Sequence, residues 1–196
     1  DSGIDFLAFS AHKMCGPTGV GCLIGKYELL KKMTPFIVGG GNNITFVKEG
    51  SAEYANPPFI FEAGTLNLEG IIGFKAAIDF INDIGIDNIE NHEKELHDYA
   101  ISQLEGCKNL TIYNKEATSI IDFNINGVFA QDEATLLNYK GIAVRSGEHC
   151  AKILHNFIGC KATVRASLYL YSSKEDIDAL VDAIKNPGDI LDAYFN

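Results

Sequence analysis

The sequence lacks long apolar runs, and it lacks an excess of basic residues. No apolar run approaches the length of a membrane span, so we expect no membrane partner. Lysine and arginine number 16 against 26 aspartate and glutamate residues, which gives a net charge of −10. A nucleic-acid-binding surface needs a basic footprint, so we expect no nucleic-acid partner either. The acidic excess mainly favours solubility.

Paired cysteines are missing as well. The five cysteines are odd in number and scattered, and no C-x-x-C pair occurs. A tetrahedral zinc site is therefore not expected, and we predict no metal. Free thiols are typical of a reducing compartment, the cytoplasm or an organelle matrix, and we predict the cytoplasm. The glycines around residues 16–21 do not make a P-loop, because no Gly-Lys-Ser/Thr follows them.

The residues that are present indicate a globular α/β protein. Apolar residues make up 46% of the chain and charged residues 21%. Gly85 is a plausible helix stop, and we place a boundary there, with one domain over 1–85 and a second over 86–196. In the first domain the pattern predicts a buried strand over 5–10, a strand over 20–24, helices over 27–33 and 68–84, and an irregular excursion over 35–64.

The second domain has the pattern of a small α+β unit. Two sequences that resemble capping boxes, Asp87–Glu90 and Ser172–Glu175, indicate helix starts. Strands are predicted over 110–113, 119–125, 142–145 and 163–170, and a further helix over 131–139. The chain begins at Asp1 with a strand-like run almost at once, and we interpret it as part of a longer protein.

The run Arg145–Ala151 (R-S-G-E-H-C-A) is the strongest chemical signal in the sequence. It places Cys150 beside His149 and close to Arg145, where a strand-like run gives way to a loop. A nearby cation stabilises a thiolate, and loops on rigid elements commonly present reactive side chains. A buried structural cysteine is the simpler alternative, and this run alone favours that alternative.

Two further basic residues stand at the ends of predicted strands. Lys13 follows the strand over 5–10 with Ser10 and His12 just before it. A lysine at the end of a core strand can be partly desolvated, which favours the neutral amine that Schiff-base formation requires. Arg165 lies near the start of the strand over 163–170, where a guanidinium can hold a carboxylate. A surface lysine and an ordinary ion pair remain the alternatives.

Four segments together resemble the motifs of one family. They are Ser10–Gly19 (S-A-H-K-M-C-G-P-T-G), Phe61–Asn67 (F-E-A-G-T-L-N), Arg145–Ala151 and Val164–Ser167 (V-R-A-S). In this order and spacing they are similar to the cysteine desulfurases, pyridoxal-phosphate enzymes of the class V aminotransferase group. The third segment resembles the second, SufS-like subgroup. The resemblance implies the C-terminal portion of a fold-type I transferase: the end of its large domain and its small α+β domain.

The resemblance also implies roles for individual residues. Lys13 carries the cofactor covalently, and Ser10 and His12 contact the cofactor phosphate. Thr65 reaches the phosphate in the neighbouring subunit of a homodimer. In the second domain, Cys150 is the sulfur acceptor. Arg165 holds the carboxylate of the substrate, and Arg145 lines the same pocket.

The implied reaction converts L-cysteine to L-alanine and leaves a persulfide on the enzyme. A sulfur-acceptor or scaffold protein of iron–sulfur cluster assembly would then take the sulfur. Glu148 and Gln131 depart from residues that are common in the family. The aspartate and the histidine that hold the family's cofactor ring have no counterpart here, so we expect the chain alone to be inactive. A selenocysteine lyase, or a non-catalytic module for partner binding or dimerisation, remain alternatives.

Overall fold

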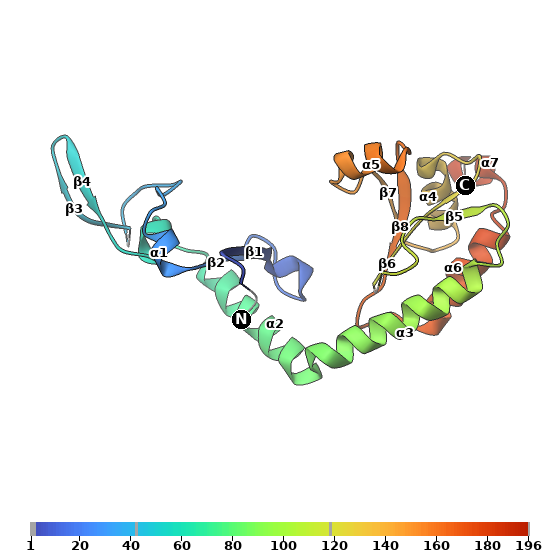
Figure 1. Ribbon diagram of the computed structural model, residues 1–196, viewed down its shortest axis with the longest axis horizontal. Helices are drawn as coiled ribbons and strands as arrows, with labels where there is room; N and C mark the ends of the chain where they lie inside the picture. The colour runs from blue at the N-terminus through green and yellow to red at the C-terminus, as the bar shows by residue number, and fades with distance from the viewer. Residues whose placement is uncertain (1–2, 42, 118, 196) are drawn as a thin grey trace. The chain divides into compact units, whose positions relative to one another are not determined.

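The structure is a computed structural model that describes residues 3–41, 43–117 and 119–195. Helices and strands are mixed along the whole chain, which confirms the predicted α/β class. The chain divides into two compact units, Asp1–Gly85 and Ile86–Asn196, which are described separately (Figure 1).

The first unit contains two antiparallel hairpins and one long helix. β1 and β2 form one two-stranded sheet, and β3 and β4 form the other. The elements are β1 (Phe6–Ser10), η1 (Ala11–Lys13), β2 (Gly21–Gly25), α1 (Tyr27–Leu30), β3 (Ile44–Lys48), β4 (Ser51–Tyr54), η2 (Phe59–Phe61) and α2 (Leu68–Ile84). The predicted strands and the long helix are confirmed, and the second hairpin lies within the predicted excursion over 35–64. The first helix is shorter than predicted.

The β1–β2 hairpin is more exposed than the sequence predicts. Phe6 is 41% exposed and Leu7 is 47% exposed, so the prediction of a buried strand over 5–10 is wrong. Phe9 makes an edge-to-face ring contact with Phe74 of α2, with the ring centroids 5.9 Å apart. An apolar run predicts burial only if other elements cover it. In the described part of this unit β1 pairs with β2 alone and leaves Phe6 and Leu7 open.

Helix α2 begins and ends at residues that its sequence predicts. The side chain of Asn67 accepts a hydrogen bond from the amide of Gly70, which satisfies one of the free N–H groups of the first turn. Gly85 ends the helix with φ 89°, a conformation that favours glycine. The next helix, α3 (Ile86–Leu104), already includes Asp87 in its first turn. The predicted capping box starting at Asp87 is therefore wrong, because that residue is inside the helix.

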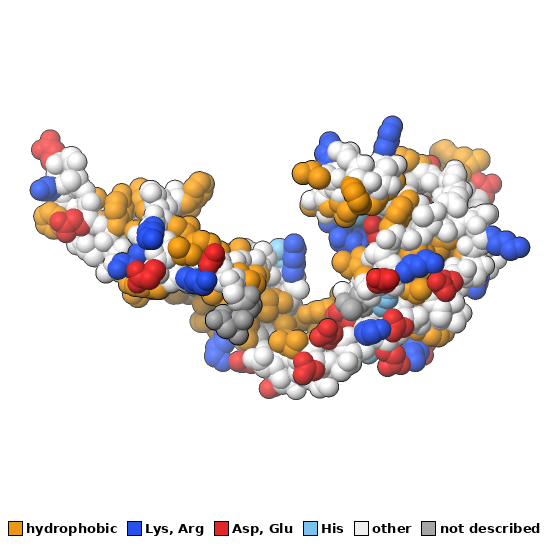
Figure 2. All heavy atoms as spheres, viewed as in Figure 1, with side chains coloured by type: hydrophobic (Ala, Val, Ile, Leu, Met, Phe, Trp, Pro, Cys, Tyr) orange, Lys and Arg blue, Asp and Glu red, His pale blue; other side chains and the backbone are white. Residues whose placement is uncertain are grey.

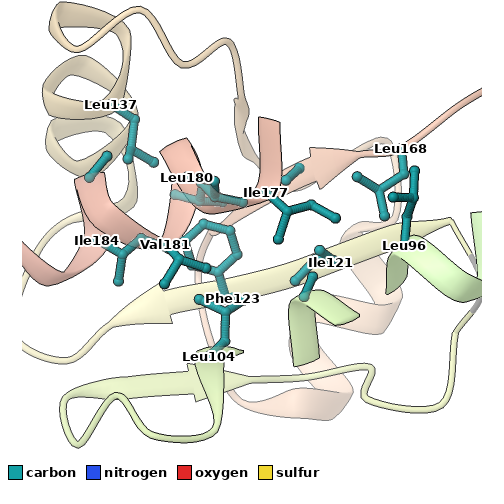
Figure 3. Close-up of a cluster of buried hydrophobic side chains, with 14 of the residues drawn as sticks. Leu96, Leu104, Ile121, Phe123, Leu137, Leu168, Ile177, Leu180, Val181 and Ile184 are labelled. Atoms are coloured by element: carbon teal, nitrogen blue, oxygen red, sulfur yellow. The ribbon is translucent and has the colours of Figure 1, made fainter. Parts of the chain in front are cut away.

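The second unit is a four-stranded antiparallel sheet covered by helices. The strand order is β5-β6-β8-β7, so β7 is an edge strand. Besides α3, the elements are β5 (Leu110–Ile112), β6 (Ile120–Ile125), α4 (Ala130–Tyr139), β7 (Arg145–Gly147), α5 (Lys152–Ile158), β8 (Thr163–Ser167), α6 (Lys174–Lys185) and α7 (Ile190–Phe195). The hydrophobic core joins α3, α4 and α6 to one face of β6 and β8 (Figure 3).

The core depends on the period-two alternation of β6 and β8. Ile121 and Phe123 of β6 and Val164 of β8 are completely buried. Residues between them in each strand, such as Asp122 and Arg165, point to the opposite face of the sheet. The predicted apolar face of the last long helix is confirmed, since its core residues are Ile177, Leu180, Val181 and Ile184.

The start of α6 differs by one residue from the sequence prediction. The observed capping box pairs Ser173 with Asp176, with each side chain bonded to the other residue's backbone N–H. Ser172 is used elsewhere, because its hydroxyl accepts a hydrogen bond from the amide of Tyr169 at 3.1 Å. The predicted pair Ser172–Glu175 is therefore wrong by one position.

Candidate active site

Cys150 lies in a short loop between β7 and α5 of the second unit. The strand before it is Arg145–Gly147, so the prediction of a strand over 142–145 is wrong. The amide of Ile142 donates to the carbonyl of Leu137 at 2.9 Å, which holds this segment in the turn that follows α4. The ladder to β8 begins only at Arg145, which is paired with Arg165.

The thiol of Cys150 is exposed and lies beside a cation. Arg145 Nη2 lies 3.7 Å from Cys150 Sγ. A guanidinium nitrogen is thus within contact distance of the sulfur. The alternative of a buried structural cysteine is wrong, because the side chain is open to solvent and forms no disulfide.

The backbone of this loop is unusual at two consecutive residues. His149 has φ 51° and Cys150 has φ 61°, which places both in the left-handed region. Residues other than glycine seldom adopt this conformation, and it persists only where the surroundings hold it. The amide of Ala151 donates to the carbonyl of Glu148 at 2.8 Å and closes the turn.

His149 is the buried member of the loop. Its side chain is 7% exposed, and Nε2 contacts both the carbonyl and the hydroxyl of Thr163. Burial lowers the pKa of His149, and the nearby Asp122 carboxylate opposes that shift. The ring of His155 in α5 lies 5.9 Å away, centroid to centroid.

Helix α5 follows the cysteine loop and was not predicted. It has seven residues, and Gly159 ends it in the left-handed conformation. Ile153 is 86% exposed and Phe157 is 88% exposed, so its apolar residues gather on the surface (Figure 2). The spacing of Ile153 and Phe157 is helical, and Gly159 is a stop signal. Seven residues carry too little periodicity, however, to predict a helix from the sequence.

A row of charged side chains crosses three strands next to the loop. In the ladders, Asp122 of β6 is paired with Arg165 of β8, and Arg165 is paired with Arg145 of β7. Directly opposed residues of an antiparallel sheet lie on the same face, and like charges there are unfavourable without a counter-ion. Arg165 is half-buried, and its Nε has no hydrogen-bond partner among the described residues. With two guanidinium groups against the single carboxylate of Asp122, the row has a net positive charge that can accept an anionic group.

Lys13 lies in the first unit, in the tight turn between β1 and β2. Its side chain is exposed, so the expectation of a partly desolvated amine is wrong for this structure. The turn itself is closely packed: the amides of Met14 and Gly16 both donate to the carbonyl of Ala11 at 2.9 Å. A Cβ at Gly16 would lie 2.8 Å from Ala11 Cβ, which only glycine avoids. Ser10 is the last residue of β1, and His12 lies beside Lys13 in η1.

Thr65 belongs to a segment that is tied to the lysine turn. Thr65 is exposed and lies two residues before Asn67, the residue that caps α2. Asn67 Nδ2 also donates to the carbonyl of Gly19 at 3.4 Å. The structure of this unit thus connects the segment of Thr65 to the turn that carries Lys13.

Metal-binding clusters and membrane-spanning helices are absent from the part of the chain that the structure describes. No group of three or more His, Cys, Asp or Glu side chains among them has the arrangement of a metal site. No helix within the described ranges is both long enough and apolar enough to cross a membrane.

Known proteins with similar sequences and structures are cysteine desulfurases. The chain is 47% identical over 93% of its length to a probable cysteine desulfurase of Halalkalibacterium halodurans. It is 41% identical over 94% of its length to a cysteine desulfurase of Haloferax volcanii. The crystal structure of the Escherichia coli cysteine desulfurase CsdA, in its S-sulfonic acid form, superposes with a TM-score of 0.90 at 38% identity, covering 94% of this chain and 46% of that one.

The chain spans about half the length of the curated relatives it matches, 45% of the first and 44% of the second. The family model for class-V aminotransferases matches residues 1–180. This match extends over the lysine turn, the Thr65 segment, the cysteine loop and the arginine row, and on it the chain belongs to the class-V aminotransferase family.

Proposed function

We propose that this chain supplies the cofactor lysine and the sulfur-accepting cysteine of a pyridoxal-phosphate-dependent cysteine desulfurase. The observation that carries the proposal is the exposed, free thiol of Cys150 with the Arg145 guanidinium 3.7 Å away. The names of relatives at 41–47% identity support the reaction type.

The residues of the lysine turn fit pyridoxal phosphate. Lys13 offers an exposed amine for covalent attachment, and Ser10 and His12, close to it in the sequence, offer hydrogen-bond donors for a phosphate. The close packing of Gly16 against Ala11 supports a turn of defined shape. When bound, pyridoxal phosphate supplies an electron sink that makes the Cα proton of an attached amino acid removable.

The steps of the proposed reaction are assigned to Lys13 and Cys150 from the chemistry of their side chains. The Lys13 amine takes up the Cα proton of the substrate at Nζ. The Cys150 thiolate then attacks the sulfur of L-cysteine, so that an S–S bond forms while the substrate's Cβ–S bond breaks. The electron pair of the broken bond stays with Cβ, which takes up a proton to become a methyl group, and Lys13 returns a proton to Cα, which gives L-alanine. The enzyme retains the sulfur as a persulfide.

The arginine row is proposed to bind the substrate carboxylate. Arg165 is half-buried, and its guanidinium group has the charge and the planar donors that suit a contact with a carboxylate. Arg145 is paired with it across the ladder and also lies beside Cys150, so one guanidinium can influence both the carboxylate and the thiolate. Fixing the substrate in this way favours the meeting of the two sulfur atoms.

The finer assignments rest on the resemblance of the motifs. We infer a SufS-like enzyme of the second subgroup from the Arg145–Ala151 segment. We also infer a homodimer in which Thr65 contacts the partner's cofactor phosphate, and transfer of the persulfide to an acceptor or scaffold protein of iron–sulfur cluster assembly. Five free cysteines support a reducing compartment such as the cytoplasm.

An alanine-release assay with L-cysteine and pyridoxal phosphate, run on the full-length protein that contains this chain, tests this function. Cys150→Ala and Lys13→Ala are each expected to reduce alanine release to background, and Lys13→Ala is also expected to abolish the absorbance of the lysine-bound cofactor. Cys107→Ala is a matched control, because Cys107 is a free cysteine in another part of the second unit. Normal alanine release by Cys150→Ala would reject Cys150 as the sulfur acceptor.

The same assay separates the alternatives. Turnover of selenocysteine with negligible turnover of cysteine would favour a selenocysteine lyase over a desulfurase. Absence of cofactor absorbance and of turnover in the unmodified full-length protein would favour a non-catalytic module.

A further inference from the structure

A hydrogen-bonded chain of three side chains leads from the sheet to the cysteine loop. Thr163 Oγ1 donates to Asp122 Oδ1 at 2.7 Å. His149 Nε2 lies 3.0 Å from Thr163 Oγ1 and 3.1 Å from the Thr163 carbonyl oxygen. Thr163 is completely buried and the His149 side chain is 7% exposed, so little water competes for these bonds.

These contacts determine where the hydrogen of the imidazole lies. A hydroxyl group has one hydrogen, and that of Thr163 is given to the Asp122 carboxylate. Thr163 Oγ1 can therefore only accept from His149 Nε2, and a carbonyl oxygen also only accepts. Nε2 must then carry the hydrogen, which leaves a lone pair on Nδ1 of the neutral ring. His149 Nδ1 is buried and has no hydrogen-bond partner among the residues that the structure describes.

The anchored ring lies next to the strained part of the loop. His149 and Cys150 are the consecutive residues with left-handed backbones. Such a conformation relaxes unless something holds it. The side chain of His149 is bonded to β8, while Cys150 directly after it is exposed and faces Arg145. The ring thus adds a side-chain restraint to the backbone hydrogen bond that closes the turn.

We propose that Asp122 and Thr163 are positioning residues for Cys150, acting through His149. They orient the imidazole with its hydrogen on Nε2, and the bound ring holds His149 and Cys150 in the conformation that presents the thiol to Arg145. A role of this positioning in sulfur transfer rests on the proposed function. The hydrogen bonds that hold the His149 ring, and their effect on the Cys150 thiol, are independent of the proposed function.

The charged and titratable groups around the ring come from every neighbouring element. Asp122 of β6 raises the pKa of His149, whereas burial and the guanidinium groups of Arg165 in β8 and Arg145 in β7 lower it. The ring of His155 in α5 lies 5.9 Å away. Because burial is the largest of these effects, the neutral ring with a free Nδ1 is the form favoured at neutral pH.

The test compares two substitutions of one residue. Thr163→Val keeps the shape and removes the hydroxyl, whereas Thr163→Ser keeps the hydroxyl. Iodoacetamide is the probe, and the rate of Cys150 alkylation at pH 7 is read by mass spectrometry, with Cys107 in the same sample as the internal control. We expect Thr163→Val to slow alkylation of Cys150 about three- to tenfold, the effect of losing one buried hydrogen bond, and Thr163→Ser to restore most of the rate.

A second measurement reports the anchor directly. Long-range ¹H–¹⁵N correlation spectra of His149 are expected to show a protonated Nε2 and an unprotonated Nδ1 at pH 7 in the natural sequence and in Thr163→Ser. In Thr163→Val only the backbone carbonyl is left to accept from Nε2, so a smaller preference for the hydrogen on Nε2 is expected. A hydrogen on Nδ1 in the natural sequence would overturn the proposal, and so would a Thr163→Val protein with an unchanged Cys150 alkylation rate.

The substitution His149→Gln covers the case in which Thr163→Val fails to fold. A glutamine amide nitrogen can replace Nε2 as the donor to Thr163, whereas His149→Leu cannot supply any donor. We expect His149→Gln to alkylate at Cys150 faster than His149→Leu, and equal rates would overturn the proposal. Failure of the proposed function is distinguishable, because it would appear as normal alanine release by Cys150→Ala with these alkylation differences intact.

Discussion

The carboxylate of Glu133 accepts a hydrogen bond from the backbone amide of Ile125, with Oε2 and the nitrogen 2.9 Å apart. Glu133 has no exposed surface, and its other oxygen has no partner among the described residues. Burial raises the pKa of Glu133 to about 7, and the bond from Ile125 only partly opposes that shift. The folded chain therefore keeps a proton on this carboxyl at pH values at which the unfolded chain has released it.

A pH-dependent stability follows from this difference. Between a pH of about 4.5 and about 7 the unfolded chain binds fewer protons at Glu133, so the free energy of unfolding falls as the pH rises. The contribution is fully present below that window and lost above it. Glu133→Gln cannot ionise, and we expect it to raise the free energy of unfolding at pH 8 by on the order of 1–3 kcal/mol.

Urea unfolding at pH 5 and at pH 8 measures this effect. The exposed Glu116 offers the control, and Glu116→Gln is expected to keep the pH dependence of the natural sequence. A Glu133→Gln protein that loses as much stability between the two pH values as the natural sequence does would contradict the prediction.

Arg145 is predicted to set the reactivity of Cys150. Exposed charge pairs are worth about 0.2–1 kcal/mol, so Arg145→Gln should slow alkylation of Cys150 by iodoacetamide at pH 7 about 1.5- to fivefold. Arg145→Lys should alkylate at Cys150 more slowly than the natural sequence and faster than Arg145→Gln, because a flexible ammonium replaces the planar guanidinium. Lys152→Gln is the control, since Lys152 lies 3.9 Å from Glu148 and is not paired with the thiol. Equal slowing by Lys152→Gln would indicate a general charge effect.

Gly16 is predicted to be essential for the shape of the lysine turn. In Gly16→Ala the new Cβ would lie 2.8 Å from Ala11 Cβ and 2.9 Å from its carbonyl oxygen, so the backbone must shift. We expect a loss of about 1–3 kcal/mol in the stability of the first unit, and weaker retention of pyridoxal phosphate in equilibrium dialysis. Gly39→Ala should change neither quantity, because nothing lies within 4 Å of a Cβ at that position.

The N-terminal cap of α6 gives a prediction about folding alone. Ser173→Ala removes the acceptor for the amide of Asp176 and should lower the free energy of unfolding by about 1 kcal/mol. The hydroxyl of Ser102 donates to the carbonyl of Tyr99 and caps no helix, so Ser102→Ala should change stability by less than about 0.5 kcal/mol. Urea unfolding curves of both variants distinguish a cap from an ordinary helical serine.

The parts of the fold that could be predicted are those in which one local signal is enough. Helix α2 runs over Leu68–Ile84 as its spacing predicts, because Asn67 can cap it and Gly85 can end it without help from distant residues. The sequence predicts the wrong position for the strand before Cys150, because distant residues decide where that strand lies. Residues 142–144 are apolar and strand-like, but their position is decided by the end of α4 and by the ladder to β8.

The candidate site, like the fold, is only partly predictable from the sequence. The resemblance of the motifs in Ser10–Gly19 and Arg145–Ala151 implies a cofactor lysine and a reactive cysteine, whereas the second run alone favours a buried cysteine. The alternation within β6 and β8 also places Asp122 and Thr163 on polar faces of their strands. The sequence does not show that the polar faces of β6 and β8 lie on the same side of the sheet, because that depends on the register between these distant strands.

By itself, the sequence determined the α/β class, the long helices and the four motif segments proposed to carry the chemistry, since each depends on neighbours along the chain. The tertiary structure alone decided that Cys150 faces Arg145, that Lys13 is exposed, and that Asp122, Thr163 and His149 share one hydrogen-bonded chain. The physical reason is that strand register and burial are collective. They follow from how elements pack, and a residue's own type and nearest neighbours do not specify them.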